Sequence, residues 1–176
     1  MADVSVRPAR ASDVAEIARI QVETWQFSYA DLLPAEALAG LTIEVATAAW
    51  EPAVTAPPSA RHHVLVAVEG EWTVGFTAFG PTEDDTITVG PLIVEARWRR
   101  RGHGSRLMAA TVDLARADGA GNAVAWVPEN DNGTREFLVG AGWAPDGLVR
   151  ALDTGAGELR EQRLAVSLAT GAASAD

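Results

Sequence analysis

Residues 92–108, Leu-Ile-Val-Glu-Ala-Arg-Trp-Arg-Arg-Arg-Gly-His-Gly-Ser-Arg-Leu-Met, are the segment that decides the fold. A strand is predicted at its start, an arginine- and glycine-rich loop in its middle, and a helix at its end. Gly102 and Gly104 allow the backbone to turn sharply and to approach a ligand closely. The first amides of the helix have no partner within it, and the helix dipole adds partial positive charge there. The segment therefore predicts a phosphate-type anion site.

Two better-known phosphate motifs do not match this loop. The dinucleotide fingerprint would need glycine at Leu107, and no Gly-Lys-Ser/Thr follows the loop. Taken alone, the arginines and glycines are equally compatible with a solvated turn and ordinary helix caps. The strands and helices predicted around the loop must therefore decide whether it is an anion site or an ordinary turn.

Composition restricts the class of protein. The chain has 176 residues, 48% of them hydrophobic and 22% charged, which predicts one globular domain. Because there is no cysteine, disulfides, cysteine-based zinc sites and thiol catalysis are excluded. No apolar run is long enough for a membrane span and residues 1–10 hold no apolar signal region, so we expect a cytoplasmic protein.

The charge is unevenly distributed along the chain. The net charge of −10 argues against nucleic acid as a partner, because phosphate neutralisation dominates that affinity. Within this acidic chain, five of the 14 basic residues lie in one short segment, which favours a local anion site. They are Arg97, Arg99, Arg100, Arg101 and Arg106.

The rest of the chain predicts a mixed α/β (α+β) fold. Periodicity predicts a largely antiparallel sheet of six to seven strands with helices on both faces, in one domain at 1–168, followed by a frayed tail at 169–176. Gly90-Pro91 interrupts one strand and predicts an edge or a bulge. Residues 52–60 read as a loop and 81–85 as a turn. Strands are predicted at 4–7, 63–68, 72–79, 86–94, 122–127, 144–152 and 158–168, and helices at 12–28, 34–50 with a break near Gly40, 102–118 and 130–140.

Three stretches resemble the GCN5-related N-acetyltransferases (GNAT). Residues 99–104, Arg-Arg-Arg-Gly-His-Gly, match the family signature R/Q-x-x-G-x-G/A between a strand and a long helix. Residues 130–143, an asparagine followed by a helix that ends in Gly-Trp, resemble the second motif. Trp25-Gln-Phe-Ser-Tyr29, followed by Leu33-Pro34, looks like the acceptor-side segment of many bacterial members. The order of predicted elements is similar over residues 3–168, which implies a sheet splayed between its fourth and fifth strands.

The resemblance implies acetyl-CoA as co-substrate and no metal. Pantetheine would bond the fourth strand at Leu92, Ile93 and Val94, with an amide near Ile93 or Val94 facing the thioester carbonyl. Asn130 would bond the pantetheine arm, a role that falls to Asp131 or Asn132 if the loop register differs. The pyrophosphate would be held by Arg99, Arg100, Arg101, Gly102, His103, Gly104 and Ser105, with His103 contributing its backbone amide while its ring packs or faces solvent.

The chain departs from the family at the catalytic positions. The tyrosine that often protonates the leaving thiolate corresponds to Leu138, and a glutamate base on the fifth strand corresponds to Trp126. An alkylammonium with a pKa near 10 is mostly protonated at neutral pH, so a base is useful. Glu129 and Tyr29, the single tyrosine, are the candidates, with a solvated carboxylate or a packing aromatic as the alternative. Glu83, Asp84 and Glu95 also lie nearby in sequence.

The remaining aromatic residues divide into two groups. Trp25, Tyr29 and Trp126 are expected to line an acceptor pocket. His62 and His63 are expected to be structural, because no spacing fixes a carboxylate partner for them. Trp50, Trp72, Trp98 and Trp143 are expected to anchor the core or loops.

Three hypotheses follow for function. The first is an N-acetyltransferase that moves the acetyl group to a primary amine, on a small molecule or a peptide, by direct attack in a ternary complex. The second is a non-catalytic acyl-CoA-binding or sensing module, and the third is a binder of nucleotides or phosphate esters. The sequence leaves open the acceptor, the acyl length, the base and acid, and the oligomeric state, for which a homodimer is common in such folds.

Overall fold

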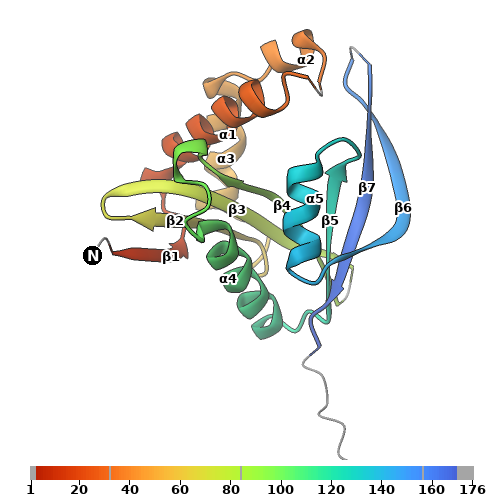
Figure 1. The fold of residues 1–176 in the computed structure, drawn as a ribbon. Helices are drawn as coiled ribbons and strands as arrows, with labels where there is room; N and C mark the ends of the chain where they lie inside the picture. Colours follow the sequence, from red (N-terminus) through yellow and green to blue (C-terminus); the bar gives the residue numbers. More distant parts are fainter. Residues whose placement is uncertain (1–2, 32, 84, 156, 170–176) are drawn as a thin grey trace, which may run out of the picture.

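The computed structural model describes residues 3–31, 33–83, 85–155 and 157–169. Their strands form one seven-stranded sheet in the order β1-β2-β3-β4-β5-β7-β6, in which β4 and β5 are parallel and all other neighbours are antiparallel (Figure 1). This confirms the mixed, largely antiparallel sheet. The strands are β1 (Val4–Pro8), β2 (His63–Glu69), β3 (Trp72–Glu83), β4 (Thr86–Val94), β5 (Asn122–Pro128), β6 (Ala144–Asp153) and β7 (Glu158–Ser167).

Helices cover both faces of the sheet and create two separate cores (Figure 1). In β4, Val89 packs in the core of α4 and α5, whereas Ile93 packs with α1 and α3. These two residues are four apart and reach opposite faces because the strand register shifts between them. None of the helices in the described ranges has the length and apolar character of a membrane span. The helices are α1 (Val14–Ser28), α2 (Ala35–Ala39), α3 (Ile43–Thr55), α4 (His103–Ala117) and α5 (Asn132–Gly140), with short 3-10 turns η1 (Ala11–Asp13) and η2 (Ala96–Trp98).

The sheet opens between β4 and β5, as expected. Parallel pairing joins only residues 86–88 of β4 to residues 122–124 of β5. Beyond them β4 continues to Val94 without pairing to β5, while β5 pairs along its whole length with β7. The expected bulge is also present: Thr77 pairs with Leu92 but Phe79 pairs with Val89, so Gly90-Pro91 opposes Ala78 alone.

Two local predictions are wrong. Helix α3 runs to Thr55 through Pro52, where a loop was expected, because Ala53 and Val54 continue its apolar face onto the α1 core. Strand β3 runs to Glu83, where a turn was expected, because β3 and β4 remain paired as far as Thr86. The tail at 170–176 lies outside the described residues, and so does Asp84.

Helix α5 begins at Asn132, slightly later than the start at residue 130 that the sequence predicts. Asp131 is the N-cap, and its Oδ1 accepts a hydrogen bond from the amide of Thr134 at 3.1 Å. Its Oδ2 accepts a second bond from the Thr134 hydroxyl at 2.7 Å. The carboxylate is therefore fixed at the start of α5, at the open end of the β4–β5 gap.

Candidate functional site

The unpaired part of β4 presents backbone groups to the gap. The amide of Glu95 donates to the carbonyl of Val74, so residue 95 faces β3. Because backbone groups alternate in direction along a strand, Leu92 and Val94 turn theirs toward the gap and Ile93 turns its own toward β3. Of the two residues whose amide was expected to face the thioester carbonyl, Ile93 and Val94, only Val94 turns its backbone toward the gap. Leu92 is the second residue that does so. The side chain of Ile93 is buried in the α1 core.

The loop after β4 is shaped to expose backbone amides. Gly102 has φ of 82°, a left-handed conformation that favours glycine, and it is the N-cap of α4. The first helical bond runs from the amide of Arg106 to the carbonyl of Gly102. The amides of residues 103–105 donate to no acceptor within the described residues, which leaves three donors at a positive helix end.

Gly104 leaves space at this helix end without being required by packing. A Cβ there would lie 3.5 Å from the Phe137 ring and 3.8 Å from the Val94 side chain, which are ordinary contact distances. Ser105 is exposed in the same turn. The backbone donors and the open surface suit a phosphate group, as the sequence predicts.

The arginines of the loop have different partners. Arg99 Nε donates to the carbonyl of Val94 at 3.2 Å, and its Nη2 lies 3.4 Å from Ser28 Oγ at the end of α1. Arg101 donates to Glu69 at 3.1 Å and covers the Trp98 ring. Arg100, with φ of 62°, is exposed and has no ion-pair partner among the described residues. Arg100 is therefore the cation of this loop that is free for an anion.

A buried histidine fixes the loop to the sheet. The His103 side chain is fully buried, and its Nε2 lies 2.8 Å from Glu69 Oε2, at the end of β2. The other carboxylate oxygen of Glu69 accepts the bond from Arg101. The ring of His103 therefore packs, as predicted, and its partner Glu69 was missed because it is distant in sequence.

Tyr29 bridges the open end of the gap. Its hydroxyl donates to Asp131 Oδ2 at 3.0 Å, which connects the end of α1 to the start of α5. Burial, the charge of Asp131 and this hydrogen bond raise the pKa of Tyr29 well above that of an ordinary phenol. Trp25 packs edge-on against Tyr29, with ring centroids 5.6 Å apart. The structure thus brings together two of the three expected acceptor residues.

Glu129 does not join this group. Its carboxylate is 41% exposed and accepts a bond from Arg160 at 3.0 Å. Because Arg160 alternates with Glu161 along β7, it lies on the opposite face of the sheet. Asn130 is exposed between β5 and α5. The carboxylate nearest to Tyr29 is instead that of Asp131.

Trp126 faces the same side of the sheet as Glu161 but is covered by arginines. The Arg150 guanidinium lies 4.3 Å from the centre of its ring, and that of Arg163 lies 5.8 Å away. Arg150 also donates to Glu161 at 2.6 Å. The negative charge of Glu161 contributes to the raised pKa of Tyr29. The sequence analysis missed Glu161, because only the pairing of β7 with β5 brings it to this part of the sheet.

The other aromatic residues are mostly structural. Trp50 and Trp143 are buried, as expected, whereas Trp72 is 58% exposed and is covered on one face by Arg97. His63 does have a carboxylate partner: its Nε2 lies 2.7 Å from Asp118 Oδ2 at the end of α4. His62 packs against Gly80 and lies within hydrogen-bond distance of Ser59.

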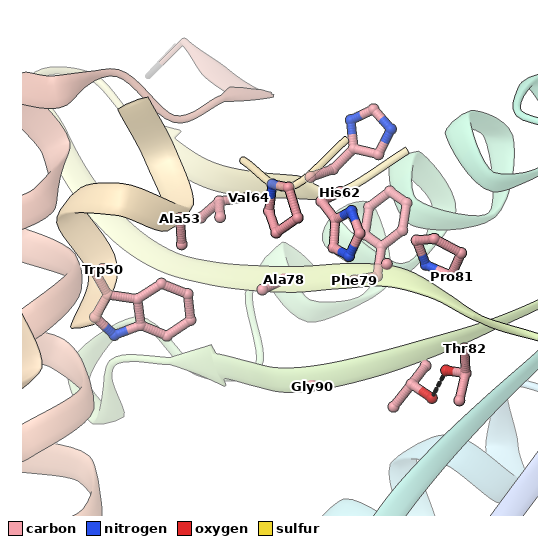
Figure 2. A pocket seen from close by; sticks show the side chains of 13 residues that line it. Trp50, Ala53, His62, Val64, Ala78, Phe79, Pro81, Thr82 and Gly90 are labelled. Atoms are coloured by element: carbon pink, nitrogen blue, oxygen red, sulfur yellow. Dashed lines mark hydrogen bonds between the residues drawn. The ribbon is translucent and has the colours of Figure 1, made fainter. Parts of the chain in front are cut away.

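A hollow lies away from this site. It measures about 370 Å³ and is formed between Trp50 and Ala53 of α3 and strands β2–β4, as Figure 2 shows. Thr82 and Thr88 bond each other at its edge. It contains none of the predicted site residues. The described residues also hold no cluster of three or more metal-ligating side chains.

Comparison with known proteins agrees with the geometry. Residues 15–142 match the model of the Acetyltransferase (GNAT) family. An uncharacterized N-acetyltransferase, YuaI of Bacillus subtilis, is 26% identical over 134 residues, which are 73% of each chain.

Two solved structures share the fold. The PaiA N-acetyltransferase of Thermoplasma acidophilum, in complex with coenzyme A, has a TM-score of 0.78 at 12% identity and covers 94% of this chain and 99% of its own. A putative acetyltransferase from Salmonella typhimurium, yncA, with its cofactor acetyl-CoA, has a TM-score of 0.70 at 19% identity and covers 97% and 96%. With its splayed sheet, its glycine-rich loop before a long helix and a family match over most of its length, the chain belongs to the GNAT family of acetyltransferases.

Proposed function

We propose that this protein is an acetyl-CoA-dependent N-acetyltransferase that moves the acetyl group to a primary amine by direct attack in a ternary complex. One observation carries the proposal. The open edge of β4 at Leu92 and Val94 leads directly to the unpartnered amides at the start of α4. A strand edge followed by a phosphate-binding helix end suits an extended amide-containing arm with a pyrophosphate at one end.

The residues present fit coenzyme A. The backbone of Leu92 and Val94 would bond the amide groups of the pantetheine arm, and Asn130 lies exposed on the other side of the gap. The amides of residues 103–105 and the side chain of Arg100 would hold the pyrophosphate. When bound, acetyl-CoA supplies the acetyl thioester. The outward-facing amide of Val94 would donate to its carbonyl oxygen and stabilise negative charge that develops there.

The proposed acid and base differ from the expected ones. The raised pKa of Tyr29 keeps its phenol neutral, so it donates a hydrogen bond and does not act as a base. Glu129 is replaced as base candidate by Glu161 of β7, whose side chain is 10% exposed and lies on the α1 side of the sheet, beside Pro128 of β5. Glu161 would take the proton that the attacking amine loses.

A non-catalytic acyl-CoA-binding module is the second candidate. Leu138, at the usual position of the acid, is 4% exposed in the core, and the face of Trp126 is covered by Arg150. A binding module requires neither an acid nor a base. Turnover with a panel of primary amines separates the two, because only the enzyme consumes acetyl-CoA in proportion to acceptor.

Calorimetric titration with acetyl-CoA tests the cofactor assignment. We expect the wild type to bind, and we expect Gly104→Glu to weaken binding roughly tenfold or more, about 1.4 kcal/mol, because a carboxylate then occupies the anion site. Gly140→Glu is the matched control, since Gly140 is a helical glycine at the opposite, C-terminal end of α5 and a Cβ there meets open space. A well-folded wild type that does not bind acetyl-CoA would refute the proposal.

A further inference from the structure

The Arg150–Glu161 pair lies on a face of the sheet that has an unusual arrangement of charge. Arg150 on β6 and Glu161 on β7 are direct register partners, and Pro128 of β5 is the next neighbour of Glu161. Leu164 of β7 points into the core on the α4 side, so Glu161 and Arg150 point to the side of α1. The pair therefore lies on the acceptor side of the proposed transfer site.

Each member of the pair uses only part of its bonding capacity. Arg150 bonds Glu161 Oε2 through Nε alone, and its Nη1 and Nη2 have no partner among the described residues. Its side chain is 42% exposed and stacks 4.3 Å above the Trp126 ring, which fixes the plane of the guanidinium. Glu161 Oε1 likewise has no partner among the described residues, and it is not one of the fully buried polar atoms. Two donors and one acceptor thus remain open side by side.

Strand register places the pair beside the reacting centre. Thr88 of β4 opposes Val124 of β5, so the gap begins two residues further on, at Gly90 and Trp126. Glu161 pairs with Pro128, which lies four residues beyond Val124, the last residue of β5 that pairs with β4, so Glu161 is at the end where β4 and β5 diverge. The influence of Glu161 on the pKa of Tyr29 independently places it near the end of the gap.

We propose that the acceptor is a free α-amino acid, with its amino group held by Glu161 and its α-carboxylate held by the Nη atoms of Arg150. This rests on the proposed function. A cation and an anion next to each other complement a zwitterion, whose opposite charges are separated by two bonds to one carbon. A simple amine or polyamine would satisfy Glu161 but would be repelled by Arg150 and by Arg163 beside it. A peptide N-terminus has no carboxylate next to its amino group.

The Arg150–Glu161 pair would also accept the proton of the acceptor and favour release of the product. The ammonium passes a proton to Glu161, the neutral nitrogen bonds to the acetyl carbon, and the carbon–sulfur bond breaks. The nitrogen then loses a second proton, which the thiolate takes up, and the proton on Glu161 returns to solvent. The product is an N-acetyl amino acid that has lost its positive charge and keeps its carboxylate. Glu161 then repels the product instead of attracting it, which favours release.

Acetyl transfer to matched acceptors tests this proposal. The wild-type kcat/KM is compared for the common L-amino acids, their α-amides and the corresponding amines without a carboxylate. We expect at least one free amino acid to exceed its amide roughly ten- to hundredfold, the range expected for charge-assisted hydrogen bonds. In Arg150→Gln this ratio should fall toward one, and Arg150→Lys, which keeps the charge but not the planar fork, should give an intermediate ratio.

Arg160→Gln is the matched control. Arg160 is on the same hairpin and is paired with a carboxylate, Glu129, but it lies on the opposite face of the sheet, so the acid-to-amide ratio should not change. Amides or simple amines acetylated as well as free amino acids would overturn the proposal and leave the acetyltransferase assignment standing. Acetyl-CoA binding without turnover of any acceptor would overturn both. If the Arg150 variants fail to fold, the wild-type ratio alone decides.

Discussion

The surroundings of a single side chain, Tyr29, define its chemistry. Burial and the adjacent Asp131 carboxylate both favour the neutral phenol and raise its pKa. Its proton is therefore available for donation at neutral pH but is not released to bulk water. Because Asp131 is fixed by capping α5, the Tyr29 hydroxyl is directed to one point at the end of the gap.

Tyr29 is the only tyrosine in the chain, so its titration can be observed directly. In the native protein, tyrosinate absorbance should develop at higher pH than in denaturant, where the pKa is about 10. Asp131→Asn should lower the native pKa, because it removes the neighbouring charge, and Glu129→Gln should leave it unchanged. Native and denatured titrations that coincide, with tryptophan fluorescence showing an intact fold, would contradict this.

The sign of the linked effect on stability follows from the direction of the shift. A pKa that folding raises contributes stability below the unfolded pKa of about 10. This contribution is lost as pH rises through the native pKa. Ionisation of Tyr29 therefore lowers the stability of the folded protein at alkaline pH and has no effect on its stability at acid pH.

At the scale of elements, the arginine- and glycine-rich loop before α4 is connected to the β2–β3 hairpin. Glu69, at the end of β2, bonds Arg101 and the buried His103, which lie on either side of Gly102. Hydrogen bonds to charged groups are worth about 1.5–3 kcal/mol each, so loss of this carboxylate frees the loop that presents the amides of α4.

We expect Glu69→Gln to lower acetyl-CoA affinity roughly tenfold while its effect on kcat stays smaller, because in the proposed complex the loop holds the pyrophosphate and not the reacting atoms. Glu71→Gln, in the exposed turn of the same hairpin, should bind like the wild type. Titration calorimetry and steady-state kinetics provide the two readouts. Equal affinity in both variants would show that the loop holds its shape without Glu69.

The sequence predicted features that local chemistry determines. Residues 92–108 form the expected strand, loop and helix because glycine and apolar spacing act within one short segment. Glu161 could not be predicted, since its place depends on β7 inserting between β5 and β6. The direction of Arg99 could not be predicted either, because its partners Val94 and Ser28 are defined only once α1 has packed on the sheet.

At the scale of the whole molecule, one sheet lies between two hydrophobic cores, one on each of its faces. Phe76 of β3 is fully buried in the core of α1 and α3, where Trp50 packs edge-on against it. Removing it would leave a cavity that the rigid sheet cannot close.

Phe76→Ala should therefore lower the free energy of unfolding by about 3–5 kcal/mol in urea denaturation. Phe27→Ala is the matched control, since Phe27 is 91% exposed and its removal should change stability by less than about 0.5 kcal/mol. A small effect at Phe76 would mean that α3 moves to fill the space.

The place of β7 in the sheet also affects how the protein is made. β5 emerges from the ribosome before β6 and β7, yet its second neighbour is β7, so residues 129–157 must be synthesised before that edge is covered. Until then the nascent chain exposes an unpaired strand edge and the apolar residues Ala125 and Val127, which Leu164 later joins in the core. Slower translation between β5 and β7 would therefore lengthen the time during which this edge is open to aggregation.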